Sequence, residues 1–303
     1  MKTTLLFLSV FLSANLFGQN VYIPDVYFKL YLVTNPDINT SGDNEIQVGE
    51  ASAYDGEMDL YGQGIFDLTG IEAFTSITFL DVSDNGLITL DVSQNSALEY
   101  LNCNDNQLTS INLNGADALI EFDCGSNQLT SLDISSNTAL EYLDCDDNQL
   151  TILNVIENTA LTNLFVTDNQ LTTLDVSQNN ALIEFDCSGN QLNCLNMSNG
   201  NNTDISFFYA TPNPPLNCIE VDNVDWANTN WYDFDIIPLQ ASFSEDCNND
   251  CSSSTVGLTQ LTTSKNLIQI VDMMGRETSF KPDTPLIYVY DDGSIEKVFS
   301  VEY

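Results

Sequence analysis

The chain has 303 residues, with 44 Asp and Glu, 6 Lys and Arg and no His, which gives a formal net charge of -38 at pH 7. Nucleic acids and anionic membrane surfaces carry the same sign of charge, so neither is an expected partner. The lack of His removes the usual catalytic triads, and carboxylates are so numerous that no pair stands out as a glycosidase site. No enzyme is therefore predicted. The acidic surface is either a coating that keeps the protein in solution or a surface that works with divalent cations.

Residues 1–19 are predicted to be a secretory signal peptide. Lys2 provides a basic start, residues 5–12 form an apolar run of signal-peptide length, and small residues precede a cut near Gly18 or Gln19. The run is too short to span a membrane, and no later stretch reaches spanning length without charge. The first cysteine is Cys103, so none lies at the cut to carry a lipid. We therefore expect an exported protein with no membrane span.

Residues 20–76 are expected to cap the repeat region that follows. One short helix is predicted here, because four apolar residues recur at helical spacing: Ile23, Tyr27, Leu30 and Tyr31. Pro24 lies near its start and Asn35-Pro36 is a natural stop. The apolar side of this helix is expected to lie on the end of the repeat core.

The twelve residues from Asn39 to Glu50 are rich in oxygen-bearing side chains, which fall at positions 1, 3, 5 and 12 of the stretch, with Ile46 at position 8. This spacing resembles the calcium loop of the EF-hand family. The resemblance implies a calcium site whose candidate ligands are Asn39, Ser41, Asp43, Glu45 and Glu50. Two positions depart from the family pattern, with Asn39 in place of Asp and Asn44 in place of Gly. The alternative is a polar turn between two elements of the cap.

Residues 77–202 contain an uninterrupted 21-residue repeat. Each unit has two halves, which read LxxLxCxxNx and LxxLxVxxNxA, and each half contains one short apolar-polar-apolar segment. Alternation points the two apolar side chains inward and the polar one outward. We therefore predict a mainly β solenoid with two short parallel strands per coil, on opposite sides of a flattened tube, whose coils bury their Leu side chains against neighbours.

Asn and Cys recur within the repeat at fixed positions. Two sets of Asn are predicted to satisfy backbone groups at the turns: Asn85, Asn106, Asn127, Asn148, Asn169 and Asn190 in the first, and Asn95, Asn137, Asn158 and Asn179 in the second. Ala116 and Gly200 interrupt the second set. One inward position holds Cys103, Cys124, Cys145 and Cys187, with Val166 in the gap. Because Val substitutes for Cys there, this column is interpreted as small core hydrophobes.

These patterns resemble the leucine-rich repeat family, whose shared core is LxxLxLxxNxL, and most of all its bacterial 21-residue subtype with two nested halves. The resemblance covers residues 77 to about 221, and it implies a curved solenoid that binds partners.

The two faces of the predicted tube differ in the side chains that they point outward. One position on the second face alternates Asp and Asn without exception, which is typical of a structural surface. The first face is varied and carries large aromatic residues, which are favoured binding anchors. The predicted ligand-binding residues are Phe79, Tyr100, Glu121, Asp123, Tyr142, Asp144, Phe165 and Glu184.

Residues 203–252 are predicted to close the tube. The segment 216–221 echoes 192–197 and reads as a last half coil, and Trp226 and Trp231 are expected to cover the open end of the core. Four cysteines cluster here in the sequence: Cys194, Cys218, Cys247 and Cys251. In an exported protein they can pair, and we predict a Cys218–Cys247 disulfide, because it would tie the half coil to the segment after Trp231.

Residues 253–303 change in character. This tail holds four of the five Lys and Arg that remain after signal removal, and it reads as one strand from Leu267 followed by a hairpin over 285–303. It is similar to the C-terminal sorting domains of the type IX secretion system in its Val271-Asp272 and Gly275-Arg276 pairs and in Lys297. The resemblance implies export by that machinery, display at the outer cell surface and removal of the tail. The alternative is a small accessory β-domain.

The sequence therefore predicts a secreted, surface-displayed leucine-rich repeat protein that binds a protein or glycan partner. The alternative is a passive structural or spacer protein of the cell envelope.

Overall fold

The structure is a computed structural model that describes residues 18–231, 236–247, 267–272, 286–290 and 295–298. The chain divides into two units, Met1–Ser253 and Ser254–Tyr303. The predicted signal peptide lies outside the described residues except for its last two. Among the helices of the described ranges, none is long and apolar enough to cross a membrane.

The N-terminal cap contains the predicted helix, α2 (Val26–Thr34), which begins after Asp25. The Asp25 carboxylate accepts hydrogen bonds from the amides of Tyr27 and Phe28, which supplies acceptors for free amides at the helix start. The predicted inward side of the helix is only partly right: Ile23 is buried and Tyr31 packs against the core, but Tyr27 and Leu30 are exposed, and Phe28 and Leu32 are the buried residues of the helix. The helix is apolar on all sides, so spacing alone could not select the buried one.

A second cap helix, α3 (Val48–Ala53), was not predicted. It begins after Gln47, where a capping box links the Gln47 and Glu50 side chains to each other's backbone amides. The short strand β1 (Met58–Asp59) and the 3-10 turn η1 (Ile71–Ala73) complete the approach to the first coil.

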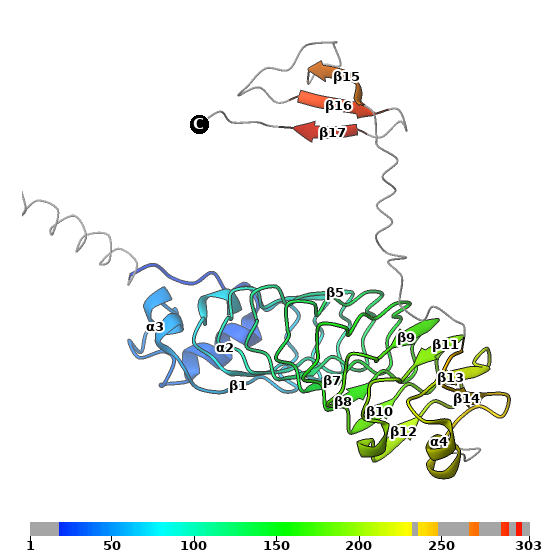
Figure 1. Cartoon of the computed structure of the whole chain (residues 1–303). Helices are drawn as coiled ribbons and strands as arrows, with labels where there is room; N and C mark the ends of the chain where they lie inside the picture. The colour runs from blue at the N-terminus through cyan, green and yellow to red at the C-terminus, as the bar shows by residue number, and fades with distance from the viewer. Residues whose placement is uncertain (1–17, 232–235, 248–266, 273–285, 291–294, 299–303) are drawn as a thin grey trace, which may run out of the picture. The chain divides into compact units, whose positions relative to one another are not determined.

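The first face of the solenoid is one parallel sheet of eight strands (Figure 1). Each strand pairs with its neighbour one coil later, so that Phe79 lies beside Tyr100 and Tyr100 beside Glu121. In spatial order the strands are β1, β2 (Phe79–Asp81), β4 (Tyr100–Asn102), β6 (Glu121–Asp123), β7 (Tyr142–Asp144), β8 (Asn163–Phe165), β10 (Glu184–Asp186) and β12 (Phe207–Tyr209).

The second face is interrupted. It consists of a two-stranded sheet and a four-stranded sheet, with strands β3 (Thr89–Asp91), β5 (Ser110–Asn112), β9 (Thr173–Asp175), β11 (Cys194–Asn196), β13 (Cys218–Glu220) and β14 (Ser242–Ser244). The prediction of two strands in every coil is therefore wrong for residues 131–133 and 152–154, which form no strand. Ladder hydrogen bonding holds neighbouring strands about 4.8 Å apart, and the middle of the second face lacks that constraint.

The inward positions form one continuous core along the tube. The cysteine column is part of it: Cys103, Cys124, Cys145 and Cys187 are fully buried free thiols, and Val166 occupies the same column. Burial raises the pKa of all four thiols well above its usual value, so they remain neutral, and the prediction of small core hydrophobes is confirmed.

The first Asn set forms the predicted ladder. In one step, the Asn148 amide donates to the carbonyls of Cys124 (3.0 Å) and Cys145 (3.2 Å), while its oxygen accepts from the Leu129 amide (2.9 Å). The ladder runs one coil further than predicted, to Asn213. The residue before each of five of these Asn is left-handed, with φ between 49° and 53°: Asp84, Asp105, Ser126, Asp147 and Asp168. Asp tolerates this conformation better than most residues, which lets the chain turn sharply inward.

The second Asn set is also buried and donates to carbonyls of the preceding coil, as Asn158 does to Ile134 and Asn137. Both corners of the repeat are thus closed by side-chain amides, and the coil length is held constant by these contacts.

The C-terminal cap closes the core with α4 (Val224–Asn230), the 3-10 turn η2 (Asn202–Asp204) and strands β12 to β14. Trp231 is buried, and its ring centroid lies 5.0 Å from that of Phe208. β13 pairs in parallel with β11, which confirms the last half coil. The Cys218–Cys247 disulfide is present, as predicted, and Cys194 is disulfide-bonded as well.

The second unit contains three antiparallel strands, β15 (Leu267–Asp272), β16 (Leu286–Tyr290) and β17 (Ile295–Val298). The predicted first strand and hairpin are both confirmed. The Gly275-Arg276 pair lies outside the described residues.

Candidate ligand-binding face

The eight predicted ligand-binding residues all lie on the first face, at the two outward positions of strands β2 to β10. Seven of them are half-buried and only Glu121 is exposed. The aromatic residues therefore point outward, as predicted, but neighbouring side chains cover part of each ring. Neighbouring strands are about 4.8 Å apart, so large rings on adjacent coils cover one another.

The aromatic rings form two groups along this face. Phe79 and Tyr100 are stacked, with ring centroids 4.4 Å apart and an angle of 6° between their planes. The second group begins with Tyr142 and Phe165, whose ring centroids are 5.7 Å apart. It continues to Phe207 and Tyr209 on β12. The sequence reasoning missed these last two residues, because β12 follows β10 after 23 residues rather than 21 and the segment 206–210 shows no alternation of polar and apolar residues.

A small cavity separates the two aromatic groups at Glu121. It has a volume of about 220 Å³ and is lined by Tyr100, Glu121, Phe122, Asp123 and Tyr142. We refer to this cavity as the tyrosine slot. It arises because Glu121 lies in register between Tyr100 and Tyr142 on adjacent strands, so that a carboxylate side chain stands where the neighbouring coils have rings.

The second outward position of each strand mostly holds an Asp or Asn that closes a local turn. The Asp144 carboxylate, for example, accepts from the amide of Asp146, two residues later, at 3.0 Å. In the next coil Phe165 occupies this position and has no such acceptor. Asp146 of the preceding coil takes its place and accepts from the Thr167 amide. The sequence reasoning did not select Asp146, because its role depends on a contact between coils.

This arrangement crowds carboxylates together in the middle of the first face. Burial, together with the charge of neighbouring Asp123, raises the pKa of Asp144 from 3.8 to about 6. Burial and the charge of Asp144 raise the pKa of Asp146 to about 7, and burial also raises the pKa of Asp123. The same surroundings raise the pKa of the Tyr142 hydroxyl. Each shift shows that negative charge is costly at this place.

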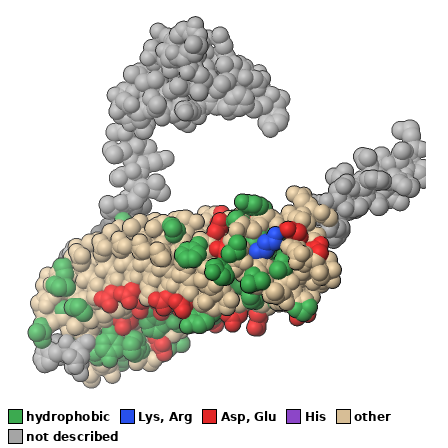
Figure 2. Space-filling model, turned by 180° about the vertical axis from the view of Figure 1, so that it is seen from behind, with side chains coloured by type: hydrophobic (Ala, Val, Ile, Leu, Met, Phe, Trp, Pro, Cys, Tyr) green, Lys and Arg blue, Asp and Glu red, His purple; other side chains and the backbone are tan. Residues whose placement is uncertain are grey.

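The repeat region holds no basic side chain to offset these charges. The sequence has no Lys, Arg or His between Lys29 and Lys265, and Lys29 forms an ion pair with Glu45 in the N-terminal cap, at 2.8 Å. Figure 2 shows one side of the molecule, on which acidic side chains lie in several groups and the coloured basic atoms occur at a single place. Among the described residues, the carboxylates of the first face therefore have no ion-pair partner.

The second face lacks these features. The pKa of Asp133 there is lowered, because the side chain and amide of Ser135 donate hydrogen bonds to its carboxylate. Asn112 separates Asp91 from Asp133 along this column and donates to Asp91 at 3.1 Å. Alternation of Asp with Asn thus limits repulsion between neighbouring carboxylates, and this face carries no aromatic column.

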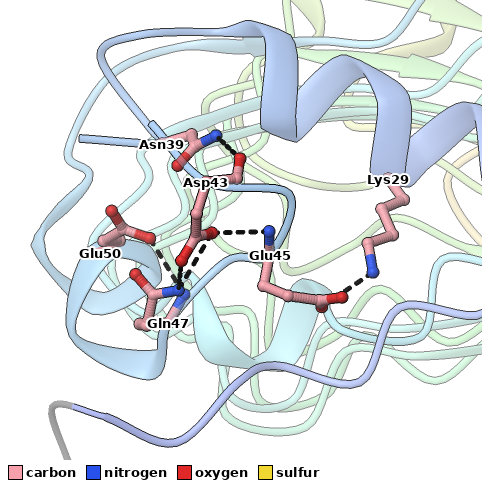
Figure 3. Close-up of polar contacts among 6 residues, drawn as sticks. All are labelled: Lys29, Asn39, Asp43, Glu45, Gln47 and Glu50. Atoms are coloured by element: carbon pink, nitrogen blue, oxygen red, sulfur yellow. Dashed lines mark hydrogen bonds and ion pairs between the residues drawn. The ribbon is translucent and has the colours of Figure 1, made fainter. Parts of the chain in front are cut away.

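The candidate calcium ligands lie in the N-terminal cap, and Figure 3 shows their contacts. Asn39 is buried and donates to the carbonyls of Val33 (2.9 Å) and Asp43 (2.6 Å). Its side-chain oxygen accepts from the Ser41 hydroxyl at 3.1 Å. The Asp43 carboxylate accepts from the Glu45 amide at 2.7 Å. These three candidates are therefore engaged within the loop itself.

The other two candidates are engaged as well. Glu45 pairs with Lys29. One carboxylate oxygen of Glu50 caps α3 by accepting from the Gln47 amide at 3.0 Å, and the other accepts from the Ser41 amide at 2.7 Å within the loop. The left-handed turn lies at Gly42, with φ 70°, rather than at Asn44, where the calcium-loop pattern requires it. Within the described ranges no three His, Cys, Asp or Glu side chains are grouped to hold a metal ion. This arrangement does not fit a calcium loop, so calcium binding stays a prediction that requires these contacts to open.

Several solved structures of bacterial leucine-rich repeat proteins are similar to this one. The functional domain of InlJ from Listeria monocytogenes, which includes a cysteine ladder, matches with 29% sequence identity and a TM-score of 0.53, over 61% of this chain and 50% of that chain. The chain folds as a leucine-rich repeat solenoid. A leucine-rich repeat protein from Leptospira interrogans matches with 18% identity and a TM-score of 0.47, over 63% of this chain and 53% of that one.

Internalin C2 from Listeria monocytogenes matches with 18% identity and a TM-score of 0.45, over 64% of this chain and 97% of that one. No protein-family model matches the sequence, and a search of curated proteins found no match. The chain spans half the length of the InlJ chain that it resembles.

Proposed function

We propose that this leucine-rich repeat protein is exported, displayed at the outer cell surface, and binds a partner protein through its first face. The observation that carries the proposal is the combination of two half-buried aromatic groups with carboxylates that form no ion pair among the described residues. Aromatic side chains offer a large contact area for few rotors, and they dominate binding energy at protein interfaces. Uncompensated carboxylates between them favour a basic partner, because charge complementarity steers association.

A paired substitution outside the tyrosine slot tests this proposal. The full mature chain is used to capture surface proteins, and binding of each captured protein is then measured with purified components. Phe79→Ala combined with Phe165→Ala should weaken binding by about 2 kcal/mol or more, as expected for aromatic anchors. Ser110→Ala combined with Ser131→Ala, on the second face, is the matched control and should change nothing.

Three results would contradict the proposal in different ways. A stronger effect of the serine pair would place the interface on the second face. Binding to purified surface glycans that the phenylalanine pair abolishes would replace the protein partner with a glycan. An absence of any ligand, with unchanged surface properties when the repeats are deleted, would favour a passive spacer of the cell envelope.

We further propose that the second unit is a sorting signal for the type IX secretion system. Its confirmed features are one strand followed by an antiparallel hairpin, and its sequence is similar to such domains. Deletion of residues 267–303 should leave the protein in the periplasm, and mass spectrometry of the surface form should find the tail removed. Surface display that persists after the deletion would refute this role.

A further inference from the structure

The tyrosine slot is distinguished from the rest of the first face by its two aromatic walls. Tyr100 ends one aromatic group and Tyr142 begins the other, and both line the same cavity as Glu121. At Phe79, by contrast, the neighbouring ring of Tyr100 lies directly against it, with ring centroids 4.4 Å apart. In the slot a ring-sized space remains between the two tyrosines.

The spacing of the coils sets the width of this space. Tyr100 and Tyr142 pair with the two sides of Glu121 in register, so they are two strand spacings apart, about 9.6 Å. A group centred between them lies about 4.8 Å from each ring, inside the distance of about 6 Å at which a cation is attracted to an aromatic face. The space therefore suits one flat or compact cation held between two rings.

The charged side chains that line the slot are all acidic. Glu121 is exposed at the rim and Asp123 is half-buried beside it. One oxygen of the Asp123 carboxylate accepts from the Gly125 backbone amide at 2.9 Å and from the Asn104 side-chain amide at 3.4 Å. No ion pair to either carboxylate is present among the described residues. The carboxylates thus present open acceptor positions to a donor that enters between the rings.

We propose that the tyrosine slot binds one arginine side chain of the partner protein. A guanidinium is planar and stacks on aromatic faces, and its fork of N–H donors matches carboxylate oxygens, whereas a lysine ammonium is a compact and strongly hydrated point charge. This inference rests on the proposed function, because it names the chemical group by which a partner is recognised. The slot accordingly sets the specificity of the first face, and the flanking rings add contact area.

The experiment uses a small probe, so that it does not depend on knowing the partner. The full mature chain, labelled with carbon-13 in its tyrosine rings, is titrated with N-acetyl-arginine amide and observed by NMR. The ring signals of Tyr100 and Tyr142 should shift together and saturably. The same titration with N-acetyl-citrulline amide, which is neutral and nearly the same shape, should produce no saturable shift.

Two sets of variants complete the test. Glu121→Gln combined with Asp123→Asn should weaken arginine-amide binding at least about tenfold, because it removes both charge-assisted hydrogen bonds. Asp123→Asn keeps the local turn, because Asn102, at the equivalent position of the preceding coil, accepts from the Asn104 backbone amide at 3.0 Å. Asp175→Asn on the second face is the matched control and should leave binding unchanged.

The outcomes separate this inference from the proposed function. Equal binding of the arginine and citrulline amides, or unchanged binding in the Glu121 and Asp123 variant, would overturn the slot assignment. Equal binding of N-acetyl-lysine amide would overturn the choice of guanidinium. If a partner is lost with the Phe79 and Phe165 pair while the arginine amide never binds, the proposed function stands and the slot does not. If the arginine amide binds but no partner protein does, the slot assignment stands and the proposed function does not.

Discussion

Removal of one crowded carboxylate should stabilise the protein at neutral pH. Asp144 lies in the middle of the first face, where burial and the charge of Asp123 raise its pKa from 3.8 to about 6. Its turn hydrogen bond to the Asp146 amide does not need a charge, because Asn102 makes the same bond in another coil. Asp144→Asn therefore removes the charge and keeps the turn.

The direction of the pH dependence follows from the raised pKa. The folded protein binds a proton at Asp144 more tightly than the unfolded chain does, so the free energy of unfolding falls as pH rises from the unfolded value of 3.8 to about 6. For a fully buried group, a pKa shift of this size corresponds to a change of about 3 kcal/mol in the free energy of unfolding. Asp144 is only half-buried, and solvent screening reduces the figure to about 1 kcal/mol. The variant should gain that amount above about pH 7 and almost nothing near pH 4.

Urea denaturation of the full chain at several pH values measures this gain, with wild type and variant compared at each pH. Asp175→Asn is the matched control, because Asp175 makes the same turn bond on the second face, to the Ser177 amide at 2.9 Å. Its neighbours in the column are Asn154 and Asn196 rather than carboxylates, so it should gain less. A gain for Asp144→Asn that is constant with pH, or that the control matches, would refute the reasoning.

Three further predictions concern stability and metal binding. Asn148→Ala should lower the free energy of unfolding by about 2 kcal/mol, because it leaves the buried Leu129 amide without its acceptor and removes one of the two donors to the Cys124 carbonyl; exposed Gln149→Ala is the control, and equal effects of the two would contradict a structural Asn ladder. Replacing Cys218 and Cys247 with Ala should cost about 3 kcal/mol, since the disulfide closes a loop of 29 residues; urea denaturation measures it, and an unchanged midpoint would show that the cap is held without this bond. Calcium should raise the melting temperature of the mature protein if residues 39–50 open to bind it; no shift, or an equal shift in Glu50→Gln, would reject the site.

The period of the repeat was sufficient to derive most of the solenoid. Small or branched apolar residues at the inward positions, Asn at nearly every corner and a constant length repeat the same local requirement in every coil, so one unit predicts the core, the outward columns and the parallel pairing. The Cys218–Cys247 bond could be predicted for a related reason, since the half coil at 216–221 is recognisable by its own pattern. These features depend on interactions within a coil or between identical positions of adjacent coils.

The details of the candidate site depend instead on contacts between different positions of different coils. The half-burial of the rings, the bond from Asp146 to the Thr167 amide and the tyrosine slot all arise where the repeat departs from itself, at Glu121 and Phe165. The N-terminal cap also depends on such contacts. Two of the residues that spacing assigned to calcium are held by the cap helices instead: Glu45 by Lys29 of α2, and Glu50 by the capping box at the start of α3. A linear pattern specifies which side chains point outward, whereas their partners are set by how far apart packing leaves the coils and helices.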